Sequence, residues 1–423
     1  MSKYFTIAAI CLTSLSFAGY SQVQTLNPYS KIGLGFLEQE SNISNPGMGG
    51  SSIWINNRNT LNISNPAGLS ALDTLSFVLE IGVKSRFSHM TIPGATKKST
   101  NTNFGYFSFG FRGSKHWTAG IGLIPLTSKG YKILDREEVA NLGAINKYYL
   151  GSGGINALYL TNAFDISDNF AAAISVRYLF GKLEETNTLI LQNLPNSFNT
   201  QQGIKDQLSD FDFKIGLQYH IKQNENSRYS IGLVASPQTK IQGKRNSIKG
   251  TTRGSNLWST DDNIFIDIIE ADTNKTIQYD KPFSITLGAG KTVFNKHSLG
   301  FEYHFENWQA TNYQNIKNAH RLSAGMSVIP QWNSATRYFK RTTYKFGAFF
   351  ETTNLRVNNT DINLFGFASG ITMPIRRGIY ALDIDMQMGQ LGTNSNNQIK
   401  DYYARLSFKL RFSEIWFYKP KYD

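Results

Sequence analysis

The chain of 423 residues has little cysteine, little proline and little charge: one cysteine, 11 prolines, and charged residues at 17% of the total. A single cysteine excludes an intramolecular disulfide framework and a multi-thiolate metal site. After the first twenty-odd residues, no stretch approaches the ~18 consecutive apolar residues that a membrane-spanning helix needs. Sparse charge combined with 13% aromatic residues also argues against a disordered chain.

The residues that are abundant point to β-structure. The chain has 36 glycines, 21 tyrosines and 29 phenylalanines, which favour strands joined by tight turns. The length by itself suggests two or three domains at ~150 residues each, although large barrels are single domains of this size. The formal net charge is +13.

The first residues predict export. A positive charge at Lys3 and an apolar run over residues 5–17 are typical of a secretory signal peptide. Small residues precede Gln22, so we expect cleavage there and removal of residues 1–21. Cys11 lies inside this segment, so the exported chain is expected to have no thiol chemistry at all.

From residue 73 onward, segments of ten to fourteen residues alternate apolar and polar side chains. Residues 211–221 place Phe, Ile, Leu and Tyr on one face and Asp, Lys, Gly, Gln and His on the other. Residues 299–306 and 405–412 repeat this pattern. An apolar face opposite a charged face is the pattern of a transmembrane β-barrel, whereas soluble sandwiches use shorter strands. We predict an all-β, antiparallel transmembrane barrel of about fourteen strands over residues 73–412, an even number as bacterial barrels require.

The connections between these segments alternate in length. Short polar turns such as residues 113–114 alternate with long stretches, namely 85–100, 127–150, 182–208 and 241–280. Outer-membrane barrels place long loops outside and short turns in the periplasm. We therefore expect both termini, including a C-terminal tail over residues 413–423, to lie in the periplasm of a bacterial outer membrane.

An N-terminal segment, residues 22–72, precedes the first strand and is rich in Asn, Gly, Ser and Pro. Its composition fits either a periplasmic linker or a plug inside the lumen. The stretch of small residues at 47–52 and the motif Asn65-Pro66-Ala67-Gly68-Leu69 resemble the N-terminus of the FadL-type family. That family consists of outer-membrane transporters for long-chain fatty acids and aromatic hydrocarbons. The resemblance implies that residues 22–72 form a hatch in a fourteen-stranded barrel, with Asn65, Pro66, Ala67 and Gly68 as gate residues.

The remainder of the chain resembles this family more loosely. Residues 151–156, 338–344 and 416–422 look like the FadL-like barrels of Bacteroidota. In FadL-type transport the substrate leaves sideways through the wall, and Gly120, Gly122 and Pro125 are the candidates for a break in the third strand. Proline cannot pair centrally in a sheet. An ordinary strand end, with glycines packed against a neighbouring backbone, explains these residues equally well.

The basic surplus suggests a partner at the membrane surface. Basic residues gather in the longest predicted loop, where they would face the phosphates of lipopolysaccharide: Lys240, Lys244, Arg245, Lys249 and Arg253. An exported barrel is not expected to bind nucleic acid.

No catalytic or metal-binding constellation is present in the sequence, and no cofactor is expected. His297 and His304 are seven residues apart, which puts them on opposite faces of a strand and argues against shared metal ligation. Two non-enzymatic functions remain open. One is passive uptake of hydrophobic compounds such as long-chain fatty acids, gated by the hatch; the other is a barrel subunit of an outer-membrane assembly or secretion machine, with protein partners. A polar porin is disfavoured because a fifty-residue hatch would obstruct it.

Overall fold

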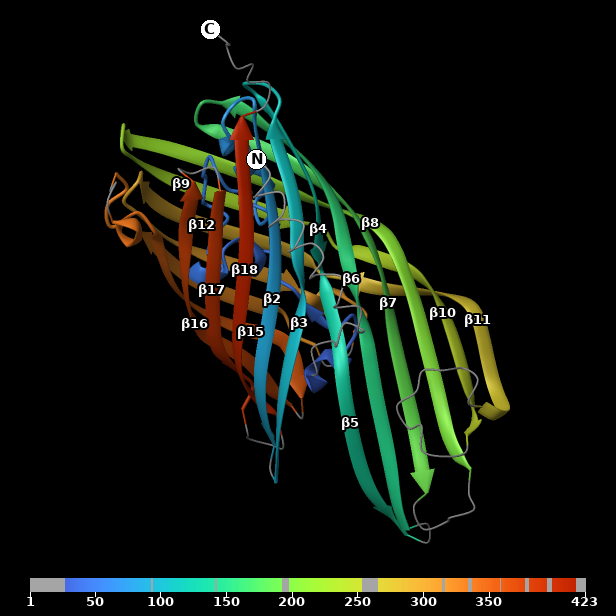
Figure 1. The fold of residues 1–423 in the computed structure, drawn as a ribbon. Coiled ribbons are helices and arrows are strands. Elements are labelled where there is room, and N and C mark those ends of the chain that lie inside the picture. The colour runs from blue at the N-terminus through green and yellow to red at the C-terminus, as the bar shows by residue number, and fades with distance from the viewer. Residues whose placement is uncertain are drawn as a thin grey trace, which may run out of the picture.

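The computed structural model describes residues 27–415, with the exception of residues 93, 141–142, 192–197, 253–264, 314–315, 334–336, 358, 377–379 and 394–397 (Figure 1). The predicted signal peptide, Arg253 and residues 416–423 therefore lie outside the described residues. No helix among the described residues is long and apolar enough to cross a membrane.

The chain forms a closed antiparallel β-barrel of fourteen wall strands, as predicted. The strands are β2 (Ser76–Ile92), β3 (Ala95–Arg112), β4 (Trp117–Pro125), β5 (Thr127–Val139), β6 (Gly143–Ser167), β7 (Phe170–Leu191), β8 (Asn199–Asn224), β9 (Ser227–Ser236), β10 (Thr239–Thr252), β11 (Phe265–Lys281), β12 (Phe283–Val293), β13 (His297–Asn307), β14 (Ala319–Val328), β15 (Thr343–Val357), β16 (Thr360–Arg376), β17 (Tyr380–Leu391) and β18 (Lys400–Ile415). The last strand pairs with the first, β18 with β2, and this pairing closes the barrel.

Three wall strands are each broken into two pieces at a proline. Pro125 ends β4 before β5, Pro237 lies between β9 and β10, and Pro282 lies between β11 and β12. In each case the two pieces follow one another along the same neighbour; for example, β4 and β5 pair successive stretches of β6. Proline lacks the N–H that a central strand needs to donate, so the ladder is interrupted there.

The apolar faces point outward and the charged faces point inward. Phe211 and Phe213 are exposed, whereas Asp212 and Lys214, which alternate with them, are buried. The same alternation holds along β13 and β18. Twelve charged side chains of the wall strands are buried or half-buried: Glu80, Lys84, Arg177, Asp212, Lys214, Glu302, Glu306, Asp383, Asp385, Arg405, Lys409 and Arg411.

The predicted long loops are wrong, because most of their residues continue the strands. β6, β7 and β8 have 25, 22 and 26 residues, about twice the 9–11 needed to cross a bilayer. Their outer parts join β5, β10 and β11 in a sheet ordered β5-β6-β7-β8-β10-β11, called here the projecting sheet. In Figure 1 it extends past the ends of β2 and β3. Both of its faces carry polar side chains, so the alternation used to find strands does not continue into this sheet.

The N-terminal segment, described from Asn27 to Leu72, lies inside the ring of strands (Figure 1, blue). It contains short elements only: η1 (Pro28–Lys31), β1 (Phe36–Leu37), α2 (Ser41–Ser44), η2 (Pro46–Met48) and η3 (Pro66–Ala71). Asn27 contacts Asp401 near the start of β18, and η3 is tied to Arg112 at the end of β3, where the short turn of residues 113–116 follows at the opposite end of the barrel. The segment therefore runs through the lumen from one end to the other.

Candidate functional site

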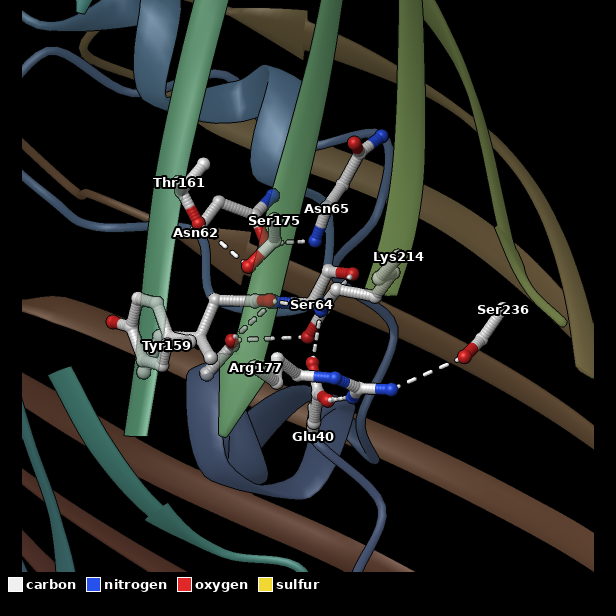
Figure 2. A network of polar contacts seen from close by, with 12 residues as sticks. Glu40, Asn62, Ser64, Asn65, Tyr159, Thr161, Ser175, Arg177, Lys214 and Ser236 are labelled. Carbon is white, nitrogen blue, oxygen red and sulfur yellow. Dashed lines mark hydrogen bonds and ion pairs between the residues drawn. The ribbon is translucent and has the colours of Figure 1, made fainter. Parts of the chain in front are cut away.

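Glu40 of the N-terminal segment lies at the centre of a buried charge network, shown in Figure 2. Its Oε1 atom accepts a hydrogen bond from Arg177 Nη1 on β7 at 2.6 Å, and its Oε2 atom is bound by Lys214 Nζ on β8. Arg177 also donates to Asp212 Oδ2 at 2.5 Å, and Lys214 donates to the carbonyl of Ile63 at 2.7 Å. Every charge in this network has an opposite charge beside it, which is the condition for burying charges at all.

Glu38, two residues earlier, binds the other side of the barrel. Its carboxylate lies 2.9 Å from Lys84 Nζ on β2 and 3.8 Å from Arg405 Nη2 on β18. Burial acts to raise the pKa of Glu38, but the charges of Lys84, Arg405 and Arg86 outweigh it and lower the pKa to about 2. For Glu40, Lys214 and Arg177 likewise overcome burial and lower the pKa.

The two glutamates together form what we call the glutamate clamp: Glu38 holds β2 and β18, and Glu40 holds β7 and β8. Sequence reasoning did not identify these residues. The sequence does contain a signal that could have identified them, because they are the only acidic residues between positions 22 and 72. Their partners are 46 to 367 positions away in the chain, so their pairing is visible only in the folded barrel.

The Asn65-Pro66-Ala67-Gly68 motif is packed against β8. The Asn65 side chain accepts a hydrogen bond from Ala67 N at 3.0 Å, so it caps η3, and donates to the carbonyls of Ile53 and Leu217 at 2.9 and 3.0 Å. Pro66 opens the helical turn, where its missing N–H is not needed. The opposing wall residue must be small, because a Cβ at Gly216 would lie 2.3 Å from Asn65 Oδ1.

The small-residue stretch at 47–52 packs against the opposite wall, β13 to β17. The backbone N–H groups of Ser52 and Ile53 donate to Glu302 Oε2 at 2.8 and 3.0 Å. Arg321 Nη2 donates to the carbonyl of Gly49 at 3.0 Å. A Cβ at Gly347 would lie 2.2 Å from the Met48 carbonyl carbon, so backbone meets backbone there.

The wall is interrupted after Pro125, between β3 and β5. β3 pairs with β4 only from Phe107 to Arg112, and no described strand of the wall pairs with β3 alongside β5. Gly120 and Gly122 lie in the paired part, where a Cβ at Gly120 would lie 3.0 Å from Leu69. Gly120 and Gly122 thus lie where neighbouring atoms pack closely, and the interruption of the pairing begins after Pro125.

The N-terminal segment occupies the interrupted edge of β5. Phe36 pairs with Ser128 and Leu37 pairs with Thr127. Hydrogen bonds from Glu38 N to the carbonyl of Leu126 and from Asn27 N to that of Gly130, both 2.8 Å, extend the contact. β1 therefore takes the place of a missing wall strand beside β5.

Little space remains behind the break. Leu34, Ile43 and Ile63 of the N-terminal segment belong to an apolar cluster with Tyr106, Ile124 and other residues of the wall. Three cavities beside the clamp measure about 10, 20 and 100 Å³, which is room for a few water molecules. A larger cavity, about 690 Å³, lies at the end with the short turns and is lined by polar side chains including Asn56, Arg58, His116, Arg228 and Lys296.

The four described residues among the predicted lipopolysaccharide contacts lie on both faces of β10. Along β10, the regular pairing with β8 puts Lys240 and Lys244 on one face of the sheet and Arg245 and Lys249 on the other. Arg245 is paired with Asp206 at 2.7 and 2.8 Å. Among the described residues, no group of His, Cys, Asp and Glu has the geometry of a metal site.

A family model named BamG matches residues 1–423, the whole chain. The chain belongs to the BamG family. Solved structures of similar fold include the CymD monoaromatic hydrocarbon channel (TM-score 0.54, 11% identity, 92% of this chain and 99% of that one) and a Pseudomonas aeruginosa FadL homologue (0.57, 10%, 91% and 100%). The P. putida toluene transporter TodX is similar at TM-score 0.57 and 13% identity, over 89% of this chain and 99% of that one. No curated protein matches by sequence. This BamG-family chain therefore has the fold of FadL-type channels.

Proposed function

We propose that this chain is an integral barrel of the bacterial outer membrane that acts as a non-enzymatic subunit of a larger outer-membrane assembly or secretion machine. The observation that carries the proposal is the closed lumen, in which the glutamate clamp joins the N-terminal segment to opposite walls. Breaking a buried ion pair costs about 3–5 kcal/mol, and the clamp holds two such groups. A passage closed in this way would need an energy source to open. The closed lumen therefore favours a function that the outer surface of the barrel carries.

The same proposal assigns a role to each segment of the chain and to its outer surface. Residues 1–21 are a signal peptide, residues 22–72 are a hatch, residues 73–412 are the barrel, and residues 413–423 are a periplasmic tail. The apolar exterior contacts outer-membrane lipids, and Lys240 and Lys244 contact lipopolysaccharide phosphates. The likeness to Bacteroidota barrels stays part of this proposal.

Extraction of the full chain from its own outer membrane in mild detergent tests this function. Native sizing and quantitative mass spectrometry should show a particle much larger than the lone barrel, with partner proteins in stoichiometric amounts. A lone barrel that carries only lipid would contradict the assembly function.

A second function, passive uptake of hydrophobic compounds such as long-chain fatty acids, is favoured by the wall break after Pro125. Residues 36–38 cover this break, so withdrawal of the segment would open a path from the lumen to the membrane. Replacing Asn65 with Ala and Pro66 with Ala tests the hatch. Faster entry of a hydrophobic fluorescent probe into vesicles would support a gate, and an unchanged rate in both variants and in Glu38→Gln would count against it.

A further inference from the structure

The projecting sheet has two outer edges, β5 and β11, and they differ. At its base, the β5 edge is covered by the N-terminal segment through the Phe36–Ser128 pair. β11 pairs with β10 on one side. Its other side, called here the β11 edge, pairs with no described strand along its whole length. An open edge presents a row of free N–H and C=O groups that another strand can pair with.

The side chains of the β5 edge protect it against such pairing. Five of the seven residues from 132 to 138 are charged, with both signs present. Interspersed charge on an edge strand is a usual means of preventing edge-to-edge association. The β5 edge is therefore built to remain solvated above the contact with the N-terminal segment.

The β11 edge has the opposite character. Residues 266–272 read Ile-Asp-Ile-Ile-Glu-Ala-Asp, with no lysine, arginine or proline. Ile266, Ile268 and Ile269 are 55%, 56% and 60% exposed. Two register shifts against β10 leave Ile266 and Ile269 without a partner residue, so both are displayed on bulges. Large apolar side chains displayed together on a surface strand mark an interaction site.

We propose that the β11 edge docks an extended segment of a partner protein by strand addition, and that this segment alternates basic and aliphatic residues. The free backbone of β11 selects a strand, the three isoleucines select aliphatic side chains, and Asp267, Glu270 and Asp272 select lysine or arginine. This inference rests on the proposed assembly function and names a surface for it on the projecting sheet (Figure 1).

A defined peptide tests the edge directly. Fluorescence anisotropy with the full-length barrel in detergent would measure binding of a nine-residue peptide that alternates lysine and isoleucine. Ile268→Lys should weaken binding by about tenfold or more, and the matched change Leu134→Lys on the β5 edge should leave it unchanged. A peptide with glutamate in place of lysine, or with N-methylated alternate amides, should not bind. Equal binding of the N-methylated peptide, or no effect of Ile268→Lys and Ile266→Ser, would overturn the proposal.

Native sizing separates this proposal from the function on which it rests. If the wild-type chain migrates in a large particle and Ile268→Lys leaves that particle intact, the β11 edge is not the docking surface while the assembly function stands. If wild type migrates as a lone barrel, the assembly function fails and the peptide experiment alone decides the edge. If the barrel dimerises with increasing concentration and Ile268→Lys abolishes the dimer, a second copy of this chain occupies the β11 edge. That result would overturn the proposal of a different partner protein. Migration on unheated gels verifies that each variant is folded.

Discussion

Ion pairs occur in two very different places in this molecule, the lumen and the projecting sheet. In the lumen, Arg177 is paired with Glu40 and Asp212, and these side chains are between 0% and 14% exposed. In the projecting sheet, Lys147 is paired with Glu137, and their side chains are 31% and 53% exposed. Both are contacts between a basic side chain and a carboxylate, but their exposure to solvent differs. The pairs of Glu40 fix the N-terminal segment in the lumen, whereas the Lys147–Glu137 pair on the sheet is solvated and contributes little.

The largest expected effect comes from removing a luminal charge. Arg177→Met leaves Glu40 and Asp212 without the guanidinium that both of them bind, and we expect a loss of about 3–5 kcal/mol in the free energy of unfolding. Urea unfolding of the barrel refolded in lipid vesicles measures it. A loss below about 1 kcal/mol would remove the contrast between lumen and sheet.

The second prediction concerns pH. The folded pKa of Glu38, about 2, is below its ordinary value of 4.5. The unfolded state therefore binds the proton more readily, so this contribution is complete above about pH 4.5 and is lost as the pH falls through about 2. Glu38→Gln should flatten the stability profile over that range. An unchanged profile in the variant would contradict the assigned ion pairs.

The outer face of β8 supports a third prediction, because it passes from the membrane band into the projecting sheet. Phe213→Arg puts a charge on the lipid-facing surface, where the cost is about 2–4 kcal/mol at the bilayer midplane. The control Lys205→Arg, on the projecting part, should change the free energy of unfolding by less than about 0.5 kcal/mol. Equal losses of unfolding free energy at both positions would show that the membrane-facing part of β8 does not lie at Phe213.

The smallest effect is expected at the exposed pair itself. Lys147→Ala removes the contact with Glu137, and a loss of about 0.5 kcal/mol or less should follow. The same unfolding titration measures it. A loss as large as that of Arg177→Met would show that exposure does not separate the two regions.

Much of the barrel follows from sequence, because each membrane-spanning stretch has one apolar and one charged face. Residues 211–221 already indicate which side chains face outward, and the wall count of fourteen is confirmed. The projecting sheet escaped prediction because polar side chains occur on both of its faces, so its strands lack the apolar and polar alternation of the barrel wall. Glu38 and Glu40 escaped because their partners lie on strands distant in sequence. The Asn65-Pro66 motif could be located in the segment, but its contact with Gly216 required the fold.

The central claim is that the lumen is closed, and electrical conductance across a planar bilayer tests it most directly. The purified full-length barrel should insert without opening a steady conductance, and Glu38→Gln combined with Glu40→Gln should increase brief openings. A stable open channel in the wild-type protein would contradict the account.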